Sequence, residues 1–235
     1  MQSIKVRYFL FLVPLLGLLT AATTTYTYAE EEPRASFSTA KLTDAETTLT
    51  KATTVYKNII NKNKVPSSVS KNAKCVAIFP SVVTAAIGVG GTAGDGVAFC
   101  RNAAGMDWGN PVFLDLAGGS FGLQAGVKSS DLVLYLTGDN ARTSIQNGAF
   151  KLAGDLSAVA GTFDESYVAP PSGVVAYAST EGVFAGASVV GVDISHDKDS
   201  QRAFYGTYNS SAVFDGRPPA KGERSIAELG GMLPS

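Results

Sequence analysis

The feature that most constrains the fold of this chain is a run of short apolar segments, divided by glycines, between residues 75 and 136. Segments of this kind are typical of strands with turns between them: CVAIF, VVTAAIGVG, GVAFC, PVFLDL, FGLQAGV and DLVLYL. Many of the 25 glycines cluster between Gly88 and Gly126, which indicates tight turns, bulges and close backbone contacts. Long helices do not alternate with these strands, so a doubly wound parallel sheet is disfavoured.

A helical pattern precedes the strands. Thr43 and Glu46 fit a capping box. Apolar residues then recur at three- and four-residue spacing, as on one face of a helix: Leu42, Ala45, Leu49, Ala52, Tyr56 and Ile59. Shorter helices are expected at residues 67–73, 139–147, 197–205 and 224–229. We therefore predict an α+β fold, an antiparallel, glycine-rich curled sheet or barrel with N-terminal amphipathic helices packed at one side.

The N-terminus has the pattern of a secretory signal peptide. Lys5 and Arg7 precede an apolar run, and small residues follow it. A membrane anchor is the rival interpretation, but the run is shorter than about 18 residues and contains Pro14 and Gly17. We expect a signal peptide at 1–29, a flexible segment at 30–40 and a single domain at 41–235 with its core at 65–208. The protein would then be secreted or periplasmic.

Export bears on the two cysteines, Cys75 and Cys100. In an oxidising compartment an isolated pair is a candidate disulfide, and the alternative is two buried free thiols. Two Cys and one His make a structural zinc site improbable, so no metal is expected. The formal net charge of −1 argues against nucleic acid as a partner.

Three short motifs suggest chemistry that their surroundings do not support. Residues 118–122 (GGSFG) fit the G-x-S-x-G pattern of serine hydrolases, but strands are predicted after Ser120, and His196 lies in the polar run SHDKD. Residues 88–93 weakly resemble a dinucleotide-binding loop, but no helix follows. Asp193, Asp197 and Asp199 miss calcium-loop spacing, and helix capping by Ser195 or Asp197 explains them more simply. We therefore predict neither an enzyme nor a cofactor, with a hydrolase using Ser120 as the remote alternative.

Four blocks of the sequence together resemble the SYLF domain family. They occur in the family's order over about residues 65–208: NAKCVAIFPSVVTAAIGVGGTAGDGVAF, WGNPVFLDLAGGSFGLQAG, SSDLVLYLTGDNARTSIQNGAFKLAGDLSAVAG and GVVAYASTEGVFAGASVVGVDISHDKDSQRAFYG. The sequence departs from the family pattern at Cys75, Ala86, Asp95 and Gln201. The resemblance implies binding rather than catalysis, with phospholipid as the ligand and, in some eukaryotic members, actin.

The resemblance links membrane contact to the N-terminal part of the domain. Here that part combines an apolar stripe with a basic side, which also includes Lys71 and Lys74. Our candidates for contact with anionic phospholipid are Lys51, Lys57, Lys62, Lys64, Leu49 and Tyr56. The stripe could equally pack on the domain's own core, and we favour that interpretation. A structural or protein-interaction role in the cell envelope is the alternative function.

Apolar strand residues raise the question of a cavity for acyl chains. We expect five of them to point inward: Val112, Leu114, Leu132, Leu134 and Tyr135. A small barrel usually has room only for its own side chains, so a filled core is favoured over a lipid cavity.

Overall fold

The computed structural model describes residues 32–62, 65–102, 107–151, 157–160, 173–179, 192–216, 219 and 221–235. The signal peptide predicted at 1–29 lies outside these residues, as does Lys64. Along the chain the helices and strands are α1 (Glu32–Lys62), α2 (Ser67–Asn72), β1 (Cys75–Cys100), β2 (Val112–Leu136), α3 (Ala141–Asn147), β3 (Ala149–Lys151), β4 (Ser157–Ala160), β5 (Gly173–Ser179), β6 (Val192–His196), α4 (Lys198–Tyr205), α5 (Ser210–Phe214) and α6 (Glu223–Met232).

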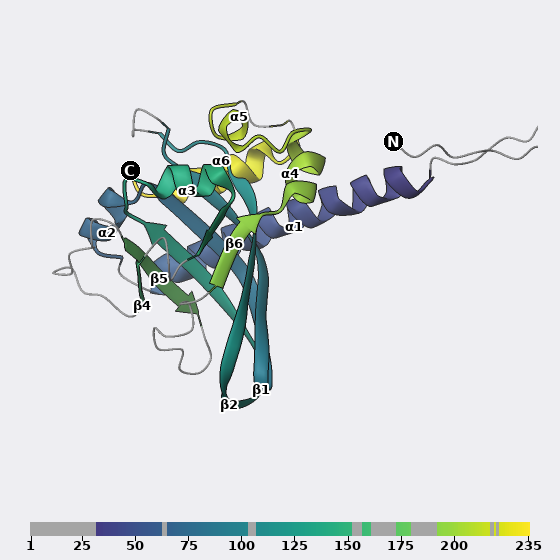
Figure 1. Ribbon diagram of the computed structural model, residues 1–235. Helices are drawn as coiled ribbons and strands as arrows, with labels where there is room; N and C mark the ends of the chain where they lie inside the picture. Colours follow the sequence, from purple (N-terminus) through teal and green to yellow (C-terminus); the bar gives the residue numbers. More distant parts are fainter. Residues whose placement is uncertain are drawn as a thin grey trace, which may run out of the picture.

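The centre of the fold is a long two-stranded ribbon that bends back on itself. β1 and β2 pair antiparallel from Cys75↔Leu136 to Ala98↔Val112, with register shifts at Phe79/Val82 and Ile87/Val89. The two ends of β1 nevertheless meet, because the Cα atoms of Cys75 and Cys100 lie 4.0 Å apart. The middle of the ribbon therefore forms a projecting tip, where the β1 and β2 labels stand in Figure 1.

The remaining strands extend the ribbon into one sheet of six strands. β2 pairs antiparallel with β6 through residues 114–118 and with β5 through residues 131–136. β3 joins β6 antiparallel, and β4 joins β5 parallel. The sheet curls without closing, and α1 packs against it. The predicted α+β class with a curled, mainly antiparallel sheet is confirmed, and of the two predicted forms the open sheet is the observed one.

The sequence predicted several short strands between residues 75 and 136, but the structure has two long strands in this region. The runs CVAIF, VVTAAIGVG and GVAFC are a single element, β1. The runs PVFLDL, from its second residue, FGLQAGV and DLVLYL belong to β2. The glycines do not break the pairing, since Gly90↔Ser120 and Gly91↔Gly119 remain in register. Both strands bend together, so the glycines mark a bend in the ribbon rather than turns between strands.

Both faces of the sheet are buried. Alternate residues of each strand point to opposite faces. One cluster fills the inside of the bent ribbon and is closed by α3 and α5; it includes Val112, Leu114, Leu132 and Leu134. The other lies on the outer face under α1, α4 and α6, and it includes Tyr135. The interior is filled with side chains as expected, but placing Tyr135 with Leu132 and Leu134 was wrong, because neighbouring strand residues face opposite ways.

Helix α1 is longer than the sequence pattern indicated. It begins at Glu32, so most of the segment expected to be flexible at 30–40 is helical. Pro33 stands in the first turn, where its missing N–H removes no helical hydrogen bond. The predicted cap at Thr43 was therefore wrong: its hydroxyl donates to the Thr39 carbonyl, 3.1 Å away, inside the helix. Among the described helices, none is long and apolar enough to cross a membrane.

The shorter helices follow the local signals of the sequence. The Asp197 carboxylate accepts a hydrogen bond from the Ser200 N–H at 3.0 Å and caps α4, as expected. Gly148 and Gly206 end α3 and α4 in the left-handed conformation. Elements α2, α3, α4 and α6 lie within a few residues of their predicted positions.

Candidate functional site

A groove of about 560 Å³ lies where the end of α1 meets α2 and the C-terminal residues. Figure 1 shows α2 and the C-terminus at this same end of the sheet. Apolar and aromatic side chains, two lysines and a few small polar residues line it: Tyr56, Ile60, Asn61, Lys62, Val65, Ser70, Lys71, Tyr135, Met232, Pro234 and Ser235. We call this site the α1–α2 groove.

The two lysines of the groove stand at the ends of helices. Lys62 is in the last turn of α1 and Lys71 in the last turn of α2, where a cation is favoured by the helix dipole. Both are exposed. No side chain among the described lining residues is acidic. The groove can therefore receive an anionic group at its rim and apolar atoms on its floor.

Two tyrosines form the buried wall of the groove. The Tyr135 hydroxyl donates to the Tyr56 hydroxyl, with 3.3 Å between the oxygens. Burial raises the pKa of Tyr56, and this hydrogen bond partly opposes the shift. Burial, together with the electrostatic interaction with the neighbouring Tyr56 hydroxyl, raises the pKa of Tyr135. Both hydroxyls therefore stay protonated at neutral pH, as hydrogen-bonding groups rather than bases or nucleophiles.

The structure separates the lipid-contact residues predicted from the sequence into two groups. Leu49 and Tyr56 are buried, with exposed fractions of 0% and 1%, and they pack in the outer cluster. Lys51, Lys57 and Lys62 are exposed. Among the predicted residues that the structure describes, Tyr56 and Lys62 come together in the groove, and Leu49, Lys51 and Lys57 do not line it. The apolar stripe of α1 thus serves the core, as we favoured, and it is not free to enter a membrane while α1 is docked.

The groove also contains residues that the sequence did not single out as a site. Val65, Ile60 and Met232 supply its apolar surface, and they come from three separate segments. Lys71 was identified from the sequence only as one of the basic residues in the N-terminal part of the domain. No local signal in the sequence indicates that these residues meet, because their meeting depends on how α6 packs against α1.

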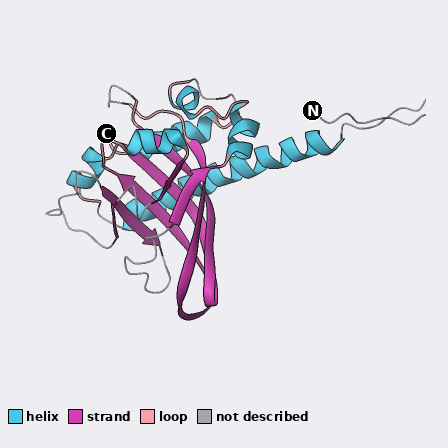
Figure 2. Cartoon of the chain, in the orientation of Figure 1, coloured by secondary structure: helices cyan, strands magenta, loops and turns pink. Residues whose placement is uncertain are grey.

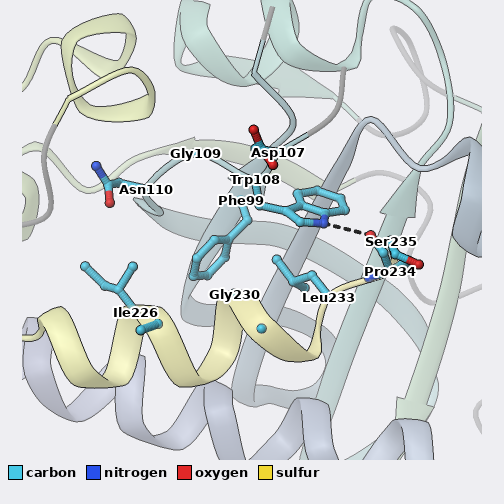
Figure 3. A pocket seen from close by; sticks show the side chains of 12 residues that line it. Phe99, Asp107, Trp108, Gly109, Asn110, Ile226, Gly230, Leu233, Pro234 and Ser235 are labelled. Atoms are coloured by element: carbon cyan, nitrogen blue, oxygen red, sulfur yellow. Dashed lines mark hydrogen bonds between the residues drawn. The ribbon is translucent and has the colours of Figure 1, made fainter. Parts of the chain in front are cut away.

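A second pocket, of about 440 Å³, lies beside Trp108 (Figure 3). Polar groups of this pocket make hydrogen bonds within the protein. The Trp108 indole N–H donates to the Pro234 carbonyl at 2.8 Å, and the Asn110 amide donates to the carbonyls of Val213 and Gly216 at 3.1 and 2.8 Å. The Arg101 guanidinium stacks on the indole and also donates to Pro234 at 2.8 Å. This pocket therefore anchors the C-terminal residues.

The residues of the hydrolase hypothesis do not come together. Ser120 is paired with Gly90 inside β2, so the strand–turn–helix surroundings that the motif needs are not found there. His196 pairs with Leu114, six residues along β2 from Ser120, which corresponds to roughly 20 Å. His196 is half-buried rather than in an exposed turn, and its Nε2 lies 2.6 Å from the Ile145 carbonyl.

Residues 88–93 lie within β1, with no helix after them, so the surroundings of a dinucleotide site are missing as well. Within the described part of the chain, no three His, Cys, Asp or Glu side chains gather in a way that could hold a metal ion. Asp193 forms an exposed ion pair with Lys151, at 3.3 Å.

Among the described acidic side chains, Asp115 has a pKa shifted from its ordinary value. Burial, reinforced by Asp197 and Asp95, raises the pKa of Asp115 to about 6. Asp95 stands directly opposite it on β1. These carboxylates repel one another at the base of the ribbon, so we read them as an electrostatic strain on the fold.

Comparison with known proteins identifies relatives of this sequence. The Ysc84 family model, described as "Las17-binding protein actin regulator", matches residues 117–230. Protein YSC84 of Saccharomyces cerevisiae is 33% identical over 189 residues, which are 72% of this chain and 40% of that protein. The human SH3 domain-containing YSC84-like protein 1 is 33% identical over 147 residues, 60% of this chain and 42% of that protein. The chain thus spans about two fifths of the length of these relatives. No solved structure matches it.

Proposed function

This chain belongs to the SYLF domain family, and from that premise we propose that it is an exported protein that binds anionic phospholipid at a membrane surface without catalysis. The observation that carries the proposal is the α1–α2 groove, in which Lys62 and Lys71 flank an apolar floor and no described lining side chain is acidic. A phosphate group would contact the lysines, and the first carbons of the lipid would lie against Ile60, Val65 and Met232.

The geometry favours binding of a headgroup over insertion of α1. Removing α1 from the sheet would expose the buried stripe, including Leu49, Tyr56 and Ile59. Each such side chain contributes about 1.5–3 kcal/mol through burial. The groove, in contrast, is open in the docked protein. Lys51 and Lys57 on the outer side of α1 would add attraction to an anionic surface without any rearrangement.

The disulfide supports the export part of the proposal. Cys75 and Cys100 are bonded, with a sulfur–sulfur distance of 2.00 Å, and no other cysteine is present in the chain. Structural disulfides persist mainly in oxidising compartments. The bond therefore fits a secreted or periplasmic protein whose residues 1–29 direct export. Mass spectrometry of the protein from the cell envelope would test this, because the mature chain should begin near residue 30 with the two thiols oxidised.

Binding to vesicles tests the lipid site directly. We expect the chain from residue 30 to co-sediment with anionic vesicles at low salt and less at high salt, because screening weakens contacts between exposed charges. Changing Lys62→Gln and Lys71→Gln together should weaken binding by about 2 kcal/mol, roughly thirty-fold, at about 1 kcal/mol for each lysine. Lys198→Gln with Lys221→Gln is the matched control, since it alters net charge equally but neither residue lines the groove. Equal loss in both double variants would remove the groove from the proposal.

A protein partner is the second candidate function. It is favoured by the family description, which names Las17 binding and actin regulation for the relatives. Co-sedimentation with filamentous actin, in parallel with the vesicles, separates the two functions. A folded chain that sediments with actin and with no vesicle would replace the lipid proposal by a protein-interaction role.

A further inference from the structure

The tip of the β1–β2 ribbon carries exposed valines. Val83, Val89 and Val127 have exposed fractions of 42%, 69% and 74%. They are three of the four large apolar residues that are exposed among the described residues, and the fourth is Tyr208. The register makes Val83 and Val127 neighbours across the two strands, since Val127 pairs with Ala85 and Val83 with Ser129. Val89 pairs with Phe121 and lies nearer the middle of the same ribbon. Among the described residues, most of the large exposed apolar side chains therefore lie on this one ribbon.

The tip is also free of charge over a long stretch of both strands. No residue between Ser81 and Gly94 is charged, and none between Leu116 and Val127. A single lysine, Lys128, follows Val127 and pairs with Thr84 at the edge of this stretch. Towards the base of the ribbon, the charges resume at the paired Asp95 and Asp115. Charged residues are a common means of keeping exposed strands from unwanted contacts. With Lys128 as its one charged residue, the tip has little of this protection, which suits a surface that meets an apolar environment with a lysine at its polar boundary.

The shape of the tip selects among apolar partners. Figure 2 shows the ribbon extending beyond the helices, so its end is convex. A convex end offers little area to a flat or rigid protein surface, whereas fluid lipid can close around it. We propose that the tip of the β1–β2 ribbon inserts Val83, Val89 and Val127 into the outer apolar layer of a phospholipid membrane. This inference deepens the proposed lipid function, on which it rests, but it uses a different surface and a different force.

The backbone limits how deeply the tip enters. Among the described strands, β1 between Val82 and Gly94 pairs only with β2, so its other edge presents backbone N–H and C=O groups. Such groups are strongly disfavoured in hydrocarbon, where no water can bond them. The side chains therefore enter the membrane while the strand edges stay at the level of the headgroups. Shallow insertion depends on apolar area and not on anionic lipid, so it should resist salt.

The test compares vesicles of phosphatidylcholine alone with vesicles that also contain phosphatidylglycerol, at low salt and at about 0.5 M salt, where screening is strong. The tip variant is Val89→Thr with Val127→Thr, which keeps the branched shape that suits a strand while replacing one methyl group of each side chain by a hydroxyl. The control is Tyr208→Ser, which removes an exposed apolar side chain outside the ribbon. We expect the binding that survives high salt to fall about ten-fold in the tip variant and to stay unchanged in the control.

A fluorescent reporter measures insertion itself. The chain contains one tryptophan, Trp108, so Val127→Trp adds a single further indole at the tip. Its emission should shift to the blue with vesicles and be quenched by brominated lipid, with the parent chain as the baseline. Binding by the parent that salt abolishes entirely, or an added indole that does not respond to vesicles, would overturn the tip proposal and leave the groove standing. The proposal would also be overturned if the parent chain forms a dimer in solution and the threonine variant is a monomer. The valines would then contact a second copy of the chain.

The two membrane proposals fail in distinguishable ways. Loss of binding only in Lys62→Gln with Lys71→Gln supports the groove and overturns the tip. Loss only in Val89→Thr with Val127→Thr supports the tip and overturns the groove as the lipid site.

Discussion

Gly96 provides the sharpest test of how the ribbon bends back on itself. A Cβ atom at Gly96 would overlap the Phe79 ring and lie 2.6 Å from the Ile78 carbonyl oxygen, because the two halves of β1 meet there. The backbone at Gly96 is not left-handed, so alanine is excluded by space alone. The carbonyl belongs to a paired strand and cannot turn aside. We expect Gly96→Ala to lower the free energy of unfolding by about 1–3 kcal/mol, as overpacked cores do.

Two other glycines of β1 complete a graded series. At Gly94 an added Cβ would lie 3.1 Å from the Val82 Cα, and at Gly91 the nearest atom would be 3.8 Å away. Gly94→Ala should therefore fall between the other two. Gly91→Ala should be neutral or stabilising by up to about 1 kcal/mol, because glycine inside a strand loses more entropy on folding than alanine. Chemical denaturation measures the free energies, and the melting temperature of Gly96→Ala should drop by roughly 3–10 °C.

The order of the three variants is the result that matters. If Gly96→Ala is as stable as the parent, the two halves of β1 do not touch at this point, and the bent ribbon is not the structure in solution. If Gly91→Ala is as destabilised as Gly96→Ala, glycine is needed for the bend itself rather than for close contact.

Three further predictions follow from buried groups. Because the folded-state pKa of Asp115 lies near 6, above its ordinary value of 3.8, ionisation of this carboxyl destabilises the fold as the pH rises from about 4 to 6; Asp115→Asn should be more stable than the parent above pH 6, with the difference vanishing below pH 4 in urea titrations. Replacing Cys75 and Cys100 by alanine should lower the free energy of unfolding by about 3 kcal/mol in the chain-entropy model, and unchanged stability under the same denaturation assay would count against the bond. Leu49→Ala should cost about 2–5 kcal/mol because Leu49 is buried, yet vesicle binding by the folded variant should match the parent; selective loss of binding would return the α1 stripe to the membrane site.

Local patterns in the sequence predicted the helices better than the strands. The spacing of Leu49, Tyr56 and Ile59 identified the buried side of α1, since helical periodicity directly reflects burial. The start of the helix was missed because Thr43 and Glu46 form a good cap by pattern, and a cap motif can also occur inside a helix. The glycines of β1 and β2 were read as tight turns, bulges and close backbone contacts. The bulges and the close contact at Gly96 are observed, but the turns are not, because no local signal distinguishes a turn from a bend shared by two paired strands.

The candidate site was only half visible in the sequence. Lys62 and Tyr56 were selected, but Val65, Lys71 and Met232 join them through tertiary packing. The exposed valines of the tip were read simply as strand residues. Nothing local marks Val89 or Val127 as unburied, because their exposure results from how far the ribbon projects beyond the helices.

The register of the ribbon also determines how quickly this protein can fold. Ala98 pairs with Val112 across a short connection, whereas Cys75 pairs with Leu136 only after both strands are complete. Closing a longer loop costs more entropy, so the ribbon should form first near Ala98 and Val112 and zip towards its other end. β5 and β6 pair with β2, so we expect them to join the sheet only after β2 has formed. Such long-range pairing is slow, on a scale of roughly milliseconds to seconds, and during that time the two apolar strands, which carry few charges, remain open to aggregation.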